Sequence, residues 1–191
     1  MEIASGYTAN PSRSLKRMKK MYEENWEPPG LREIKGFLPF TGYANSVFIS
    51  IEDESFERHE IALIHTGNEW KIDWESTVGW SELPWAEMKK LKPAQPTLIR
   101  AYVRKSDYHN FDFEDDDKWS AFQLGNYNQE QTLYGYVPAN GSMDTKLQPL
   151  SDQEVLKFLL RVRYLENSLS SNQVVIDEVI AEGWTQPEED P

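Results

Sequence analysis

The chain has 191 residues, of which 39% are hydrophobic and 13% aromatic, and it contains no cysteine. This apolar content is too high for a disordered chain and predicts one full core or two small domains. The missing thiols exclude disulfides, thiolate nucleophiles and cysteine-ligated metals. A net charge of −12 opposes contact with phosphate backbones and anionic lipid, so nucleic acid is not an expected partner.

No apolar run approaches the roughly 20 residues that cross a bilayer, and the N-terminus lacks the apolar core of a signal peptide. We therefore expect a soluble chain without membrane insertion. The compartment stays open: the protein is cytoplasmic, or it is exported or anchored and has lost its targeting segment.

A helix is predicted first, over residues 11–25, where Leu15, Met18, Met21 and Tyr22 recur at helical spacing behind the capping sequence at 10–12. A basic cluster is interleaved with these positions: Arg13, Lys16, Arg17, Lys19 and Lys20. It is either the solvated face of an amphipathic helix, which we favour, or a small anion-binding surface. Glu-Pro-Pro-Gly at 27–30 ends the helix.

Strands are predicted next, over residues 47–51, 60–65, 70–75, 98–104, 119–124, 132–137, 156–164 and 174–182. Thr66-Gly67-Asn68 indicates a hairpin turn between the second and third, and residues 126–131 join the fifth to the sixth. Residues 156–164 also follow a capping-box sequence at 151–154, which would start a helix. Their β-branched and aromatic content favours the strand.

Four tryptophans lie within residues 70–85: Trp70, Trp74, Trp80 and Trp85. The first two alternate with polar residues, which predicts a strand with both indoles and Ile72 buried on one face. The other face would then carry Lys71, Asp73 and Glu75. The last two tryptophans flank Ser-Glu-Leu-Pro, where Pro84 can begin a short helix.

The Lys-Leu-Lys-Pro-Ala-Gln-Pro segment at 90–96 breaks this regularity and predicts a division of the chain. Residues 1–92 would form a helix with a curved antiparallel sheet, and residues 97–186 a second β-rich half packed on the first. Residues 187–191 form an acidic tail. The predicted fold class is α+β, with a mainly antiparallel sheet and an N-terminal helix.

The apolar pattern of the last predicted strand indicates a β-bulge. Val174 and Ile176 share a face, but Val179 falls out of phase unless one extra residue is inserted near 177–178. Trp184, after Gly183, is then expected to be buried against an earlier segment such as residues 80–85.

Catalytic and metal-binding patterns are weak. His65 and Asp73 could form an acid–base dyad, but pairing of His65 with Trp70 across the hairpin would send Asp73 to the opposite face. The acidic run at 112–117, with possible extra ligands at 107–110, lacks the spacing and glycine of an EF-hand loop, so a solvated turn is favoured over weak cation binding. We expect no catalytic residues, metal or cofactor.

Tyr134 and Tyr136 flank Gly135 and share one face of a strand, where they either cover the sheet, which we favour, or line a shallow pocket. Candidate pocket residues are therefore Trp70, Trp74, Trp80, Trp85, His65, Tyr134 and Tyr136.

Four motifs in order resemble a family of uncharacterised bacterial proteins: Asp73-Trp74-Glu75 through Trp85, residues 106–113, residues 132–137, and residues 173–184. The likeness covers roughly residues 10–184. Trp80 and His109 stand where the family has tyrosine. The resemblance implies no assigned activity and therefore no catalytic residues.

Glu69-Trp70-Lys71-Ile72, after a helical N-terminus, also resembles the NTF2-like superfamily. That resemblance implies a cone with a cleft in the first half. Such cones serve as enzymes, ligand binders and scaffolds.

The expected function is non-catalytic binding or association with a protein or small-molecule partner, and a homo-oligomer is left open. The absence of a convergent titratable cluster motivates this expectation. The alternative is a small-molecule hydrolase or isomerase that uses His65, Asp73 or Tyr134 in a cone pocket.

Overall fold

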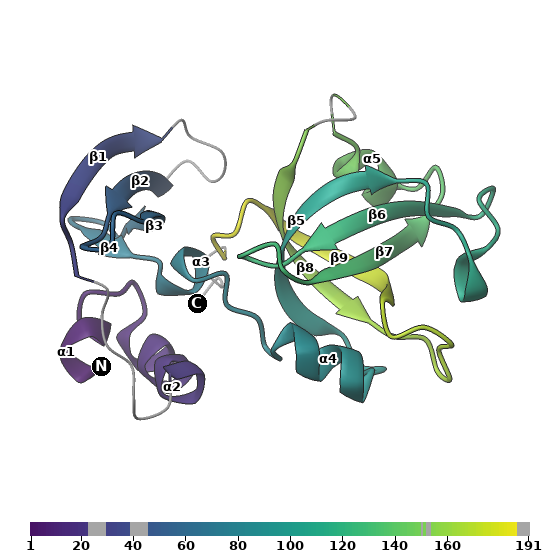
Figure 1. Cartoon of the computed structure of the whole chain (residues 1–191), viewed down its shortest axis with the longest axis horizontal. Helices are drawn as coiled ribbons and strands as arrows, with labels where there is room; N and C mark the ends of the chain where they lie inside the picture. Colours follow the sequence, from purple (N-terminus) through teal and green to yellow (C-terminus); the bar gives the residue numbers. More distant parts are fainter. Residues whose placement is uncertain (23–29, 39–45, 150, 152–153, 187–191) are drawn as a thin grey trace. The chain divides into compact units, whose positions relative to one another are not determined.

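A computed structural model describes residues 1–22, 30–38, 46–149, 151 and 154–186. The chain divides into two compact units, Met1–Val78 and Gly79–Pro191, and each is described by itself. Helices and mostly antiparallel strands, with a helix at the N-terminus, confirm the predicted α+β class (Figure 1). The expected seam at 90–96 lies inside the second unit. No helix in the described ranges is long and apolar enough to span a membrane.

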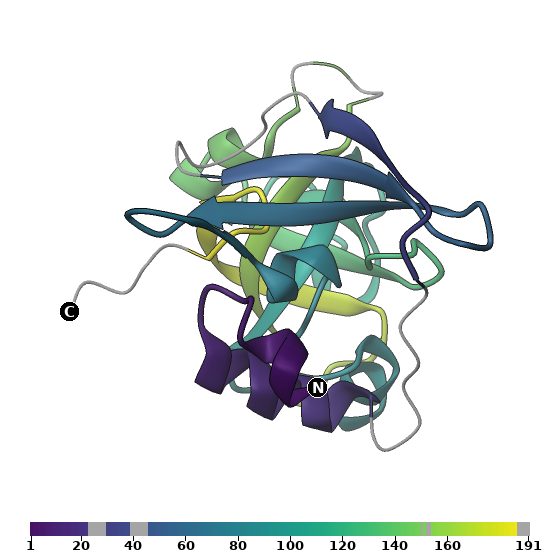
Figure 2. The same cartoon turned by 90° about the vertical axis from the view of Figure 1, so that its left-hand side faces the viewer.

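The first unit combines a four-stranded antiparallel sheet, in the order β1-β2-β3-β4, with short helices. Its elements are α1 (Glu2–Ser5), α2 (Pro11–Tyr22), β1 (Glu33–Leu38), β2 (Ser46–Glu52), β3 (Arg58–His65), β4 (Trp70–Ile72) and α3 (Trp74–Thr77). A parallel bridge between Thr8 and Ile72 ties the N-terminal segment to β4. Accordingly, α1 and α2 lie on the β4 side of the sheet (Figure 2).

The hairpin between β3 and β4 has the expected register, because His65 pairs with Trp70. The predicted strand over 70–75 is wrong in its second half. β4 ends at Ile72, and Asp73 caps α3 by accepting a hydrogen bond from the Ser76 amide. The predicted faces are wrong too: Trp70 is 50% exposed, whereas Trp74, Asp73 and Glu75 are all buried.

Burial of Glu75 explains part of the basic cluster on α2. Arg13 Nε and Arg17 Nη1 each lie 3.1 Å from Glu75 Oε1, and this carboxylate is only 2% exposed. A buried carboxylate is tolerated only when charged donors satisfy it. Two of the basic residues therefore bind an anion within the same unit, while Lys16, Lys19 and Lys20 are exposed as expected for a solvated face.

The second unit is a closed barrel in the order β5-β6-β7-β9-β8, with β8 returning to β5. Its elements are α4 (Trp85–Leu91), β5 (Thr97–Ser106), η1 (Phe111–Phe113), β6 (Trp119–Gly125), β7 (Thr132–Pro138), α5 (Ser142–Leu147), β8 (Leu156–Arg163) and β9 (Gln173–Glu182). Among the barrel's strand pairs in the described residues, only β7–β9 is parallel. This strand order, with a helix between the third and fourth strands, is that of a Greek-key barrel of the OB type.

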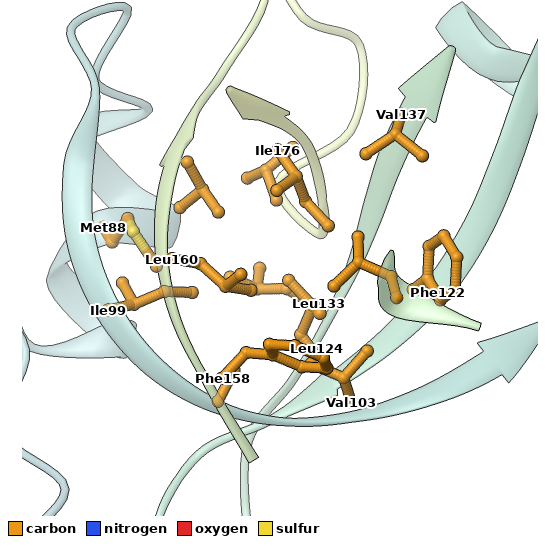
Figure 3. Close-up of a cluster of buried hydrophobic side chains, with 14 of the residues drawn as sticks. Met88, Ile99, Val103, Phe122, Leu124, Leu133, Val137, Phe158, Leu160 and Ile176 are labelled. Carbon is orange, nitrogen blue, oxygen red and sulfur yellow. The ribbon is translucent and has the colours of Figure 1, made fainter. Parts of the chain in front are cut away.

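Inward side chains from all the barrel strands form one apolar core, in which Ile99, Phe122, Leu133, Leu160 and Ile176 are fully buried (Figure 3). The helices complete it. Trp85 and Met88 of α4 and Leu147 of α5 belong to the same cluster, and the two helices lie at opposite ends of the barrel in Figure 1. Pro84 precedes α4 as its N-cap, close to the predicted helix start.

Residues 156–163 are a strand, as favoured, and the bulge predicted in the last strand is present. Val162 pairs with Ile176 but Arg161 pairs with Glu178, so Asp177 is the extra residue. Val179 then packs against the same core as Val174 and Ile176. A second irregularity of this kind leaves Ile180 unpaired in the β8–β9 ladder.

Several elements were not predicted, namely α1, β1, α3, η1 and α5. Some predictions lie outside the described residues: the end of the first helix, most of Glu-Pro-Pro-Gly, the middle of the 151–154 capping box, and the tail at 187–191.

Candidate functional site

Outward side chains of β5, β6 and β7 form a continuous polar and aromatic surface on the barrel. In β6 and β7 the neighbours Phe122, Leu124 and Leu133 point into the core, so the alternate residues point outward. The pairing register aligns these outward residues in two lines that run across the neighbouring strands. One line runs Arg104–Gln123–Tyr134–Gln173, and the next runs Tyr102–Gly125–Thr132.

A shallow pocket of about 150 Å³ lies between these lines. It is lined by Tyr102, Arg104, Gln123, Gly125, Gln129 and Thr132. Arg104 Nη2 donates to Gln129 Oε1 at 3.1 Å, which orients the guanidinium in the pocket wall. Among the described residues Arg104 forms no ion pair with a carboxylate. The pocket therefore offers a cationic fork, two amides and a hydroxyl side by side.

Tyr134 continues the pocket wall because it is the register partner of Gln123. Tyr108, from the loop between β5 and β6, stacks on Tyr134 with ring centroids 4.2 Å apart and planes 28° apart. Tyr108 remains 37% exposed, and Asn110 Nδ2 donates to its hydroxyl at 2.9 Å. We call Tyr102, Arg104, Tyr108, Gln123, Gln129, Thr132 and Tyr134 together the polar-aromatic face.

A buried hydrogen-bond network supports Tyr108. Tyr136 Oη donates to the Tyr108 carbonyl at 2.7 Å and accepts from Gln173 Nε2 at 2.8 Å. Gln173, which is fully buried, also donates to the carbonyl of Asn110 at 3.1 Å. These bonds fix the backbone on both sides of His109, so the loop presents Tyr108 in one position.

Tyr136 is therefore a structural member of this network. Its ring stacks on Phe113 at 3.9 Å, and burial raises the pKa of its hydroxyl to about 12. A hydroxyl with this pKa stays protonated at neutral pH and cannot serve as a general base there.

The loop that carries Tyr108 is also joined to the β8–β9 loop. Asp112 Oδ2 accepts from the Leu169 amide at 3.0 Å and from Ser168 Oγ at 3.3 Å. Phe111 within this loop has a φ of 51°, a conformation that costs a bulky residue energy and is held by its surroundings. The loop's backbone is therefore held from two sides.

Two groups of potential metal ligands occur among the described residues: Asp53–Glu57–His59 and Asp115–Asp116–Asp117. In the first, Asp53 Oδ1 accepts from the amides of Ser55 and Glu57, and Asp53 Oδ2 lies 2.8 Å from His59 Nε2. In the second, Asp115 pairs with Lys118 at 2.6 Å. Each group thus has internal partners, and neither includes the possible extra ligands at residues 107–110.

The predicted pocket residues fall into both units. In the first unit, His65 lies against Trp70 with ring centroids 5.0 Å apart, and Trp74 is packed edge-on against Tyr22. The Asp73 carboxylate binds both the amide and the hydroxyl of Ser76. The predicted reason against a His65–Asp73 dyad, that Asp73 lies on the opposite face of the strand, is wrong, because Asp73 caps α3 instead.

In the second unit, the four predicted residues lie in four different places. Trp85 is in the barrel core, and Trp80 packs against the cluster of Leu98, Leu159 and Ala181. Tyr136 belongs to the buried network described above. Only Tyr134 lies on the polar-aromatic face.

All members of the face except Tyr134 were missed as site residues: Tyr102, Arg104, Tyr108, Gln123, Gln129 and Thr132. The signal available in the sequence was alternation: Gln123 stands between the apolar Phe122 and Leu124, and Arg104 lies two residues after Tyr102 and directly after the apolar Val103. The register that aligns these two residues could not be read from either strand alone.

Comparison of the chain with profiles of known protein families, with characterised proteins and with solved structures gives no match. The candidate site must therefore be judged by its chemistry alone.

Proposed function

We propose that this protein is a non-catalytic binding protein and that its ligand, a protein segment or a small molecule, occupies the polar-aromatic face. The observation that carries the proposal is the combination of an open, polar pocket around Arg104 with the stacked pair Tyr108–Tyr134 beside it. Exposed tyrosines next to fixed hydrogen-bonding groups are typical of binding surfaces, because each ring offers contact area at a small entropic cost.

Position in the fold supports the same proposal. In barrels of the OB type, ligands are bound on the face of the second and third strands and by two of the loops. Here that face is formed by β6 and β7, and the loop with Tyr108 is the first of those loops. Fold alone does not assign a function, and the side chains on this face carry the proposal.

The alternative, a hydrolase or isomerase in an NTF2-like cone, stays a prediction without a supporting contact. It would require His65, Asp73 or Tyr134 to face a cone pocket in position for proton transfer. Tyr134 belongs to the barrel of the second unit. His65 instead lies on Trp70, and the Asp73 carboxylate is engaged by Ser76. The Asp53–His59 pair is a histidine–carboxylate contact, but Asp53 is already held by two amides in a turn.

Binding at this face can be tested by nuclear magnetic resonance on the isotope-labelled full chain. A panel of neutral oligosaccharides, short oligonucleotides and proline-rich peptides would be titrated in turn. We expect a binding probe to shift the amide signals of β5, β6 and β7, and to be recovered chemically unchanged. A probe that is converted to product, or binding that maps only to the first unit, would contradict the proposal.

A further inference from the structure

The chemistry of the polar-aromatic face also indicates the class of ligand. We infer that it binds an uncharged oligosaccharide, with one sugar ring in the Arg104 pocket and a neighbouring ring on Tyr108. This inference rests on the proposed function, and it adds the ligand class that the proposed function leaves open.

The pocket has the polarity that a sugar requires. Its wall presents the guanidinium of Arg104, the amides of Gln123 and Gln129, and the hydroxyl of Thr132. The guanidinium offers donors, while each amide and the hydroxyl offer both a donor and an acceptor, so neighbouring groups can bind two adjacent sugar hydroxyls at once. Arg104 and Gln129 share one hydrogen bond. An apolar ligand would displace water from the other donors and acceptors without replacing its hydrogen bonds, which costs free energy.

The size of the pocket indicates that it holds only one part of a longer ligand. A volume of about 150 Å³ is below the roughly 300–1,000 Å³ of sites that enclose a whole small ligand. One ring fits, and the rest of the ligand must then lie across the surface. Tyr134 and Tyr108 provide that surface, because they extend the pocket wall from Gln123 to the edge of the loop.

Tyr108 can bind the neighbouring sugar ring by stacking. Tyr108 is 37% exposed although its ring already lies on Tyr134. An aromatic ring held at this exposure gives a flat apolar surface with a hydrogen-bonding edge. The C–H face of a pyranose matches such a surface. The buried bonds from Tyr136 and Gln173 to the loop hold Tyr108 in place before a ligand arrives.

Charge argues against a nucleic acid on the same face. Asp112, Glu114 and the Asp115–Asp117 run follow Tyr108 in the same loop, and the chain carries a net charge of −12. Single-stranded nucleic acid needs a positive groove along its backbone as well as stacking platforms. A proline-rich peptide is also disfavoured, because its groove is lined by aromatic rings rather than by a guanidinium and amides.

Isothermal titration calorimetry on the full chain can test this. The probes are hexasaccharides of β-linked glucose, α-linked glucose and N-acetylglucosamine, together with an oligothymidylate and a proline-rich peptide. We expect one of the hexasaccharides to bind, with an affinity that changes little between low and high salt, because an uncharged ligand displaces no counterions. Tyr108→Ala should weaken binding by about tenfold, since the stacking surface is lost.

Arg104→Gln should weaken it by a similar factor. Lys105→Gln is the matched control, because it removes the same charge from the next residue of β5 without touching the pocket. Tyr7→Ala, an exposed tyrosine of the first unit, is the control for Tyr108→Ala. Tyr108→Phe keeps the ring and should retain most of the affinity. Thermal melts of each variant identify any loss of folding.

Each outcome separates the two proposals. Hexasaccharide binding that Tyr108→Ala and Arg104→Gln weaken, but Lys105→Gln and Tyr7→Ala do not, supports the sugar inference. If only the oligothymidylate or the peptide binds, and the same variants weaken it, the sugar inference is wrong while the proposed binding face stands. If no probe binds, or if folded face variants bind as the wild type does, both proposals fail.

Discussion

Arg100 and Trp184 are joined by a fully buried hydrogen bond that connects the start of the barrel to the end of the chain. Arg100 Nε donates to the Trp184 carbonyl at 2.9 Å, while Arg100 Nη1 donates to the Trp80 carbonyl at 2.9 Å. The Trp184 indole in turn donates to the Ala101 carbonyl at 3.2 Å. The Arg100 guanidinium thus links Trp184 to Trp80 through their backbone carbonyls, which is consistent with the expected closure of the domain by Trp184 near residue 80.

Truncation of the C-terminus tests this closure. Deleting residues 183–191 removes Trp184, which is 1% exposed and packs edge-on against Tyr102 at 4.8 Å. It also leaves the Arg100 guanidinium without one acceptor. We expect a loss of about 3–5 kcal/mol in the free energy of unfolding, measured by urea denaturation.

The control truncation removes only residues 187–191. These are acidic residues and prolines with no apolar side chain to bury, so we expect the unfolding midpoint to stay unchanged. Equal stability of the two truncated chains would show that the Arg100–Trp184 contact does not stabilise the barrel.

Two tryptophans of one motif should respond differently to substitution. Trp74 is 6% exposed and Trp70 is 50% exposed. Trp74→Ala should therefore cost about 3–5 kcal/mol of stability, as is typical of a deleted buried aromatic. Trp70→Ala is the matched control and should change stability by less than about 1 kcal/mol. Similar unfolding midpoints for the two variants would contradict the burial of Trp74.

Gly135 should not tolerate a side chain. A Cβ atom at this position would lie 2.7 Å from Ile176 Cδ1 and 2.9 Å from Leu124 Cδ1, inside the filled barrel. Gly135→Ala is expected to cost about 1–3 kcal/mol through overpacking. Gly125→Ala is the control, because its Cβ would meet nothing closer than 3.8 Å. The melting temperatures of both variants, measured by thermal denaturation, provide the comparison. Equal melting temperatures would rule out overpacking at Gly135.

The sequence predicted strands well where alternation and turn residues agreed, as in the β3–β4 hairpin and the bulge at Asp177. It failed at Asp73-Trp74-Glu75, where alternation continued but the Asp73 side chain captured the Ser76 amide and began α3. Local capping competed with the period-2 pattern and won. Burial of Glu75 could not be foreseen, because its partners Arg13 and Arg17 are about sixty residues away.

The candidate site was predicted only through Tyr134. Its other members come from β5, from β6, from the first residue of β7 and from two connecting segments, and they meet because of a register that depends on the whole barrel. A single strand shows which of its residues share a face, but not which strand lies beside it. The exposure of Tyr108 likewise depends on the buried bonds that Tyr136 and Gln173 make to its loop.

Stability at acid pH should depend on Asp53. A hydrogen bond from His59, and then one from the Glu57 amide, hold the pKa of this carboxyl below its ordinary value of 3.8. Because the folded pKa is lowered, ionised Asp53 stabilises the fold above that ordinary value, and the stabilisation is lost as the pH falls through the folded pKa. Asp53→Asn cannot ionise, so it should lower the melting temperature at neutral pH and differ progressively less from the wild type as the pH falls below about 4.

The control is Asp116→Asn, which removes the same charge from an exposed carboxylate of the second unit and should have little effect. Melting temperatures of the three proteins between neutral and acid pH provide the comparison, and a gap between wild type and Asp53→Asn that stays constant down to acid pH would show that ionised Asp53 is not what stabilises this turn.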